Sequence, residues 1–113
     1  MSASGRLTTH VLDTVHGRPA AGVTVVLRDP RSTLATVVTD ADGRAVVLAS
    51  GLRAGVYELR FAVGDYFAAS GADVPDPPFL DVVPVRFGIA DPRVDHHVPL
   101  LCSPWSYTTY RGS

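Results

Sequence analysis

The residues from Tyr57 to Val63 alternate strictly between large apolar side chains and polar or small ones. The apolar positions are Tyr57, Leu59, Phe61 and Val63. Because successive side chains of a strand point to opposite faces, this pattern predicts a strand with one face in a core and one in water. Such a strand needs partners for its backbone, so the chain is expected to fold around paired sheets.

Similar short segments recur along the chain with turn residues between them. We predict strands over residues 6–13, 23–28, 34–39, 44–48, 57–63 and 85–89, and two closing strands within 95–113 joined at Ser103-Pro104. Asp42-Gly43 is a hairpin signal, residues 65–69 predict a short helix capped by Asp65, and the prolines from Pro75 to Pro84 argue against regular structure before Val85. About eight strands and one short helix indicate an all-β, two-sheet sandwich formed by one domain over residues 1–113.

Composition narrows the range of functions. The chain has ten Arg, no Lys and eleven Asp plus Glu, so its formal net charge is −1. This balance argues against a nucleic-acid-binding surface. The absence of Lys rules out Schiff-base chemistry. The single Cys102 cannot form an internal disulfide, no apolar run approaches the roughly twenty residues of a membrane span, and the residues after Met1 do not resemble a signal peptide. We therefore expect a cytoplasmic protein without a membrane segment.

Two adjacent histidines, His96 and His97, begin the closing strands. Neighbours in a strand point to opposite faces, so His96 shares a face with Val98, Leu100 and Cys102, which form the apolar side. His97 therefore falls on the outer face. A second subunit covering that face would explain why Leu101, an apolar residue, shares it.

His10 has a comparable position in the first predicted strand. Leu7, Thr9 and Val11 share one parity, and His10 belongs to the other. Its side chain is therefore expected to point away from the apolar face of that strand.

Four motifs follow one another along the chain and leave only short stretches uncovered. They are LTTHVLD at 7–13, GRPA at 17–20, TDADGR at 39–44, and HVPLL with SP and the terminal YRGS between 97 and 113. Together they resemble the 5-hydroxyisourate hydrolases, the enzymes of the transthyretin-like family. The terminal YRGS is the specific part, because it separates these enzymes from the hormone-carrying transthyretins of the same fold.

The resemblance implies a transthyretin-like sandwich that assembles as a homotetramer, a dimer of dimers with active sites between subunits. It also implies hydrolysis of 5-hydroxyisourate to 2-oxo-4-hydroxy-4-carboxy-5-ureidoimidazoline in urate breakdown, without a cofactor. His10 and His97 would position and deprotonate the water, and Arg44 would hold the substrate and its growing negative charge. The expected lining and binding residues are Thr109, Tyr110, Arg111 and Ser113.

One departure from the family pattern concerns the residues before His97. The family usually has His-Tyr-His at this point, whereas this chain has Asp95-His96-His97. The catalytic position is intact, but contacts made by its neighbours are open to change.

Other functions have weaker support in the sequence. A zinc site built on His10 and His97 would need at least one further protein ligand, and no such motif is present. Cys102 has neither the face nor the neighbours of a nucleophile. A transthyretin-type carrier of a small ligand is the main alternative, and a plain interaction module is the third.

Overall fold

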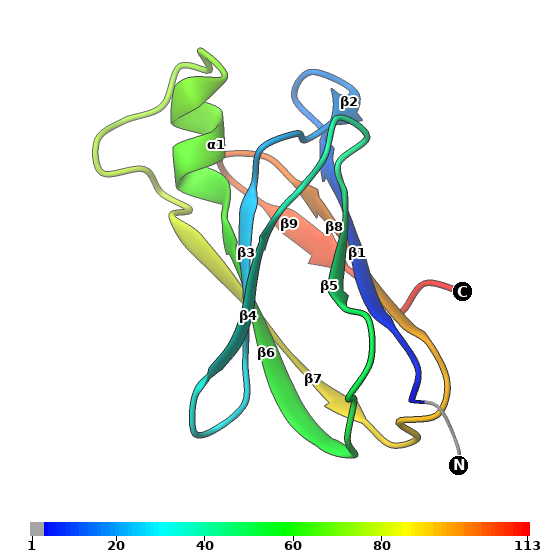
Figure 1. Cartoon of the computed structure of the whole chain (residues 1–113). Coiled ribbons are helices and arrows are strands. Elements are labelled where there is room, and N and C mark those ends of the chain that lie inside the picture. The colour runs from blue at the N-terminus through cyan, green and yellow to red at the C-terminus, as the bar shows by residue number, and fades with distance from the viewer. Residues whose placement is uncertain (1–3) are drawn as a thin grey trace.

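The computed structural model describes residues 4–113, which form two sheets packed face to face with a helix at one end (Figure 1). The five-stranded sheet contains β1 (Leu7–Asp13), β2 (Arg18–Pro19), β5 (Arg44–Leu48), β8 (His96–Cys102) and β9 (Tyr107–Thr109). The four-stranded sheet contains β3 (Thr24–Arg28), β4 (Thr33–Val38), β6 (Gly55–Ala62) and β7 (Val82–Ile89), and α1 spans Val63–Ala69. The all-β sandwich with one short helix is confirmed.

The five-stranded sheet is organised around β1 and β8, which are far apart in sequence. They pair in parallel along their whole length, from Leu7 opposite His96 to Asp13 opposite Cys102. The buried Thr9 adds a side-chain hydrogen bond of 2.7 Å from its Oγ1 to the carbonyl oxygen of Val98. This pairing brings the first and last motifs of the sequence into one surface.

The two sheets bury a common core, and strand parity decides which side chains enter it. On β1 and β6 the alternating apolar residues are buried, as the sequence predicts. The largest side chains with almost no exposed surface are Phe61, Phe67, Leu7, Leu27, Leu59 and Leu100.

Within residues 4–113 no helix is long and apolar enough to cross a membrane.

The hairpin predicted at Asp42-Gly43 is wrong, although the turn itself is present. β4 pairs with β3 and β5 pairs with β1, so the turn carries the chain from one sheet to the other. Gly43 has a φ of 74°, and a Cβ there would collide with the carbonyl oxygen of Val11. Tertiary pairing with β1 therefore overrides the local hairpin signal.

Three smaller predictions also need correction. The structure has an additional strand, β2, within the segment predicted as a turn. The helix begins at Val63, so Asp65 lies in its first turn and does not cap it. β7 begins at Val82 and contains Pro84, because β7 is an edge strand, where a missing N–H is tolerated.

A buried carboxylate ties the end of β1 to the helix. Asp13 is 1% exposed, and its Oδ1 accepts hydrogen bonds from the backbone N–H groups of Val15 and His16. Its Oδ2 accepts hydrogen bonds from Nδ1 of His16 at 2.6 Å and from the Tyr66 hydroxyl at 2.7 Å. Burial alone would raise the pKa of Asp13, but these hydrogen bonds outweigh it and lower the pKa below 3.8.

This geometry predicts the effect of replacing Tyr66→Phe. The ionised Asp13 stabilises the fold at any pH well above its unfolded pKa, and this contribution is lost as the pH falls through its lower folded pKa. Removing the phenol hydroxyl should lower the free energy of unfolding at pH 7 by about 1.5–3 kcal/mol, because the hydrogen bond is to a charged group. It should also move acid unfolding to higher pH.

Urea unfolding at pH 7 and an acid titration followed by circular dichroism measure both effects. Tyr57→Phe removes a hydroxyl bonded only to the backbone of Arg53 and serves as the control. An acid midpoint that shifts equally in both variants would contradict the role given to Asp13.

Candidate active site

Three of the predicted site residues lie together on the outer face of the five-stranded sheet. His10 stands directly opposite Arg44 in the antiparallel pairing of β1 with β5. On the other side of β1, Thr8 is the partner of His97 in β8. Neighbouring strands are about 4.8 Å apart and alternate residues of a strand about 6.6 Å, so one small molecule could touch all three side chains.

His97 is partly buried and is held by a hydroxyl group. Its Nδ1 lies 2.8 Å from Oγ1 of Thr8, which leaves Nε2 for other partners. Burial lowers the pKa of His97 below 6.5, and the positive charge of Arg44 and then the charge of His10 lower it further. A neutral imidazole at neutral pH can accept a proton from water.

His10 is oriented by the turn that precedes Arg44. Its Nε2 lies 2.9 Å from the carbonyl oxygen of Asp42, and because a carbonyl only accepts, this nitrogen donates. In the neutral ring Nδ1 is then the free acceptor. Asp40 holds the same turn, since its Oδ1 accepts the backbone N–H groups of Asp42 and Arg44.

His97 and Arg44 line a common cavity of about 310 Å³. The other lining residues are Arg6, Thr8, Thr9, Asp40, Ala45 and Val46. Sequence reasoning missed Arg6 and Thr8, although both share the parity of His10 and could have been found by extending the argument for that strand. Asp95, which departs from the family pattern, accepts the backbone N–H of Arg6 at 2.8 Å and so fixes the entry into β1.

The C-terminal tail returns to β8 beside His97. β9 pairs with β8 from Cys102 to Leu100 and the pairing then stops, because Pro99 has no N–H to offer. It resumes as a single bridge in which the N–H of Gly112 donates to the carbonyl oxygen of His97 at 2.8 Å. Ser113 follows directly and is exposed.

The remaining predicted tail residues lie apart from this group in the single chain. Thr109, Tyr110 and Arg111 line a second cavity, of about 230 Å³, with His96, Val98 and residues 85–88 of β7. This cavity lies at the edge formed by β7 and the tail, whereas His97 points to the outer face of the sheet. The structure therefore brings together His10, Arg44 and His97 and places Arg111 around the edge of the same sheet.

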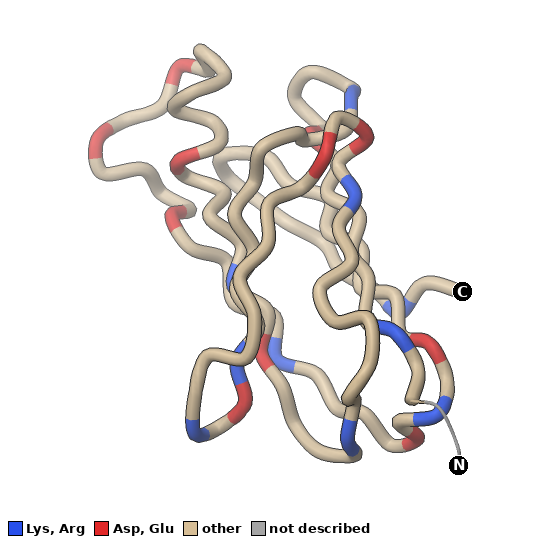
Figure 2. The backbone as a smooth tube through the Cα atoms, viewed as in Figure 1, with Lys and Arg blue, Asp and Glu red and all other residues tan. Residues whose placement is uncertain are grey.

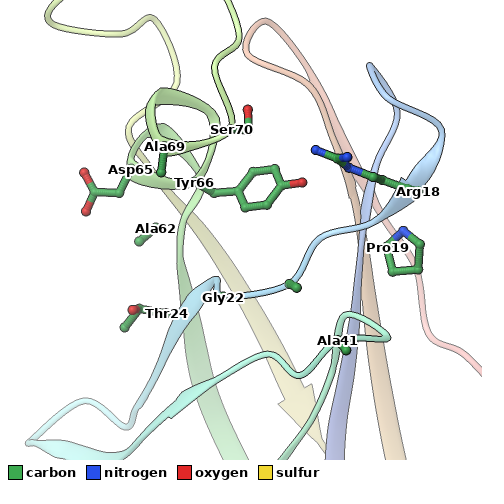
Figure 3. Close-up of a pocket in the computed structure, with 11 residues that line it drawn as sticks. Arg18, Pro19, Gly22, Thr24, Ala41, Ala62, Asp65, Tyr66, Ala69 and Ser70 are labelled. Atoms are coloured by element: carbon green, nitrogen blue, oxygen red, sulfur yellow. The ribbon is translucent and has the colours of Figure 1, made fainter.

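A larger cavity, of about 720 Å³, lies between α1 and the segment before β3. Figure 3 shows the guanidinium of Arg18 directed toward the hydroxyl of Tyr66, while the carboxylate of Asp65 points away from both. That hydroxyl is already bonded to Asp13, and no histidine lines the cavity. It therefore lacks a group suited to proton transfer at neutral pH.

Two other chemistries have little support from the described residues. Cys102 is buried, and burial followed by the charge of Asp13 raises the pKa of its thiol to about 12, so it is not a nucleophile at neutral pH. Across residues 4–113 no three His, Cys, Asp or Glu side chains are grouped so that they could hold a metal ion.

The charges are separated along the length of the sandwich. Figure 2 shows many of the acidic residues toward the end that carries α1 and most of the arginines toward the opposite end, where further acidic residues also lie. Arg44 immediately follows the acidic turn Asp40–Gly43, yet its own charge faces the outer side of the sheet with His97. The site therefore presents a cation beside two imidazoles, which suits an electron-rich, oxygen-bearing ligand.

The sequence matches one family model over nearly its whole length. The model describes the HIUase/Transthyretin family and matches residues 7–112. The chain is 53% identical to the 5-hydroxyisourate hydrolase of Ralstonia nicotianae, over 96% of this chain and 99% of that protein.

Solved structures with a similar fold support the same family. The crystal structure of (S)-allantoin synthase superposes with a TM-score of 0.91 at 43% identity, covering 99% of this chain and 45% of that one. The 5-hydroxyisourate hydrolase of Klebsiella pneumoniae superposes with a TM-score of 0.83 at 37% identity, covering 96% and 94%. The transthyretin-like fold expected from the sequence is confirmed.

The charge of Arg44 predicts a measurable effect on His97. Replacing Arg44→Gln should raise the pKa of His97, because protonating the ring no longer places two positive charges together. Titration of the imidazole carbon-bound protons by NMR measures it, with Arg6→Gln as a comparison for a cation at the rim of the same cavity. An unchanged His97 pKa in Arg44→Gln would contradict the proximity described above.

Proposed function

The chain belongs to the HIUase/Transthyretin family, and from this premise we propose that it hydrolyses 5-hydroxyisourate in urate breakdown, with His10, Arg44 and His97 as the catalytic residues. The observation that carries the proposal is the presence of two imidazoles and a guanidinium on one face of the sheet, with the pKa of His97 lowered by burial and by Arg44. Full-length relatives at about half identity carry the same enzyme name.

The reaction opens a six-membered ring with one water molecule. The water oxygen bonds to a ring carbonyl carbon, the bond from that carbon to the ring nitrogen breaks, and one water proton goes to the nitrogen. The new carboxyl group loses the other water proton to solvent and becomes a carboxylate. Nδ1 of His10, or Nε2 of His97 in the tautomer in which Nδ1 donates to the Thr8 hydroxyl, takes the first proton, and the imidazolium so formed delivers a proton to the leaving nitrogen. Arg44 holds the oxygen on which negative charge develops.

We propose that the tail completes the substrate pocket. Thr109, Tyr110, Arg111 and Ser113 are assigned to substrate binding. All four are exposed in a single chain, although the backbone around them is fixed at Leu100 and His97. Exposed side chains on a fixed backbone are free to contact a substrate or a neighbouring subunit.

A carrier of the transthyretin type is the alternative, because the family includes both kinds of protein. A carrier needs a channel of suitable shape, but it has no use for proton-transfer groups. An imidazole whose pKa is lowered by burial and by a nearby guanidinium is ready to accept a proton at neutral pH, which suits catalysis better than passive binding.

We propose a homotetramer, a dimer of dimers, as the working form. Over the described residues 4–113, β7 and β9 are edge strands with a partner on one side only, and they lie at the same side of the sandwich. Unpaired edges favour pairing with a second copy. The outer face of the five-stranded sheet also carries Val46, which is 43% exposed, close to His97.

Covering that face would exclude water from the site. Electrostatic contacts between Arg44, the imidazoles and the substrate strengthen when water is removed.

A single buried thiol, Cys102, is compatible with a reducing compartment, and we propose the cytoplasm as the place of action.

The purified protein should accelerate the loss of freshly generated 5-hydroxyisourate with no metal added, measured by the change in ultraviolet absorbance. His97→Ala should reduce kcat by about 10²–10⁴-fold, the usual contribution of a general acid–base group. His16→Ala, which removes an imidazole outside the site, should retain turnover although it weakens the contact with Asp13. A wild-type rate equal to the buffer blank would end the enzyme assignment.

Light scattering after size exclusion tests the assembly. The expected mass is four times the 12.0 kDa of one chain. Val46→Asp, which places a charge on the outer face, should lower the mass; because Val46 also lines the cavity of His97 and Arg44, the mass and not the activity is the readout for this variant. A monomeric wild type with full activity would contradict a site completed by a second subunit.

A further inference from the structure

Gly112 is the point where the tail comes closest to His97. Its backbone N–H donates to the carbonyl oxygen of His97 at 2.8 Å, and its Cα faces the imidazole ring of the same residue. A Cβ built on Gly112 would lie 2.5 Å from Cδ2 and 3.2 Å from Cγ of that ring. Real Cβ atoms essentially never lie within 3.0 Å of such atoms, so any residue other than glycine here requires the ring or the tail to shift.

The same ring is held at another point by Thr8. The Thr8 hydroxyl lies 2.8 Å from Nδ1, and Cδ2, the carbon nearest to Gly112, belongs to a different edge of the imidazole. A five-membered ring fixed at Nδ1 and confined at Cδ2 cannot turn about its Cβ–Cγ bond without breaking one contact. Its Nε2 is then left facing away from Thr8.

We propose that Gly112 is a positioning residue for His97, because its missing side chain lets the tail confine the imidazole in the orientation in which Thr8 bonds Nδ1 and Nε2 is free for proton transfer. The proposal rests on the proposed function only in giving His97 the proton-transfer role; the confinement of the ring does not depend on it.

The fold explains why a residue at the chain end can do this. Pro99 interrupts the pairing of the tail with β8, and the bridge to His97 restores it at Gly112. The pairing fixes the backbone of Gly112 relative to the backbone of His97, and the lack of a Cβ brings it against the ring. Displacing a catalytic group by about 1 Å can cost about 10²-fold in rate, so this confinement matters for turnover.

The test is Gly112→Ala, studied by NMR titration of His97 in the assembled protein and by the pH dependence of kcat/KM. The added methyl should displace the ring from its buried position. Because burial is the main cause of the lowered pKa of His97, the titration should move up toward 6.5. The acid limb of kcat/KM should move to higher pH with it, and kcat should fall by about tenfold to a hundredfold with a smaller change in KM.

Gly64→Ala is the matched control. Gly64 also sits in a tight space, since a Cβ there would lie 2.9 Å from Oδ1 of Asp81 and from Cγ of Pro78, but it belongs to α1 and is away from the ring. Gly64→Ala should lower thermal stability and leave the His97 titration as in the wild type. Assembly of both variants is checked by mass.

Two further variants also test whether the tail confines the ring of His97. A chain ending at Arg111 removes the confinement without adding a methyl, so the His97 pKa should rise in that chain also, even if Gly112→Ala does not fold. Thr8→Val acts on the same ring, so its effect on kcat/KM should be less than additive with that of Gly112→Ala.

A folded Gly112→Ala with the wild-type His97 pKa and pH profile would overturn the proposal, as would a wild-type pKa in the chain ending at Arg111. A wild type without turnover would instead contradict the hydrolase function, and the NMR comparison would still decide whether Gly112 confines the ring.

Discussion

The parallel pairing of β1 with β8 is the interaction on which the site depends. It joins residues 89 positions apart, since His97 meets Thr8, and it does so in the interior of a sheet where the register cannot slip without turning core side chains outward. The same register that buries Leu7 and Leu100 places His10 and His97 on the outer face. The packing of the core and the geometry of the proposed catalytic residues are therefore set by one constraint.

The turn between β4 and β5 places Arg44 on the outer face of the five-stranded sheet, beside the histidines. As a hairpin it would have kept Arg44 in the sheet of β4, away from the histidines. By crossing between sheets it pairs β5 with β1 and puts Arg44 opposite His10. Gly43 makes the crossing possible, because only a residue without a side chain can pass so near the backbone of β1.

Much of this could be predicted from the sequence, and the failures share a cause. The alternation in residues 57–63 and around His97 correctly predicted which side chains point into the core. This could be predicted because alternate residues of a strand point to opposite faces whatever its partners are. Strand partners are not local: the crossing at Gly43 and the tolerance of Pro84 at an edge both depend on which strand lies alongside. For the site, the motifs selected His10, Arg44 and His97, but nothing in them indicated the Thr8 contact or the approach of Gly112.

The positions of the tail residues are the reason for proposing that the site is complete only in an assembly. Arg111 lines a cavity at the edge shared with β7, while His97 faces the outer side of the sheet. A second copy pairing along that edge and a further pair covering that face would enclose both regions between subunits. Such an enclosure would favour the proposed chemistry, because a guanidinium and an imidazole act most strongly on a substrate in a site without bulk water.

The most direct test is a crystal structure of the assembled protein with a stable, planar purine analogue of the substrate. The account predicts that the analogue lies against the outer face of the five-stranded sheet, with Arg44 on its oxygens and the imidazoles of His10 and His97 within hydrogen-bonding distance. An analogue bound instead between Arg18 and Tyr66, or a site in which these three side chains contact different molecules, would contradict it.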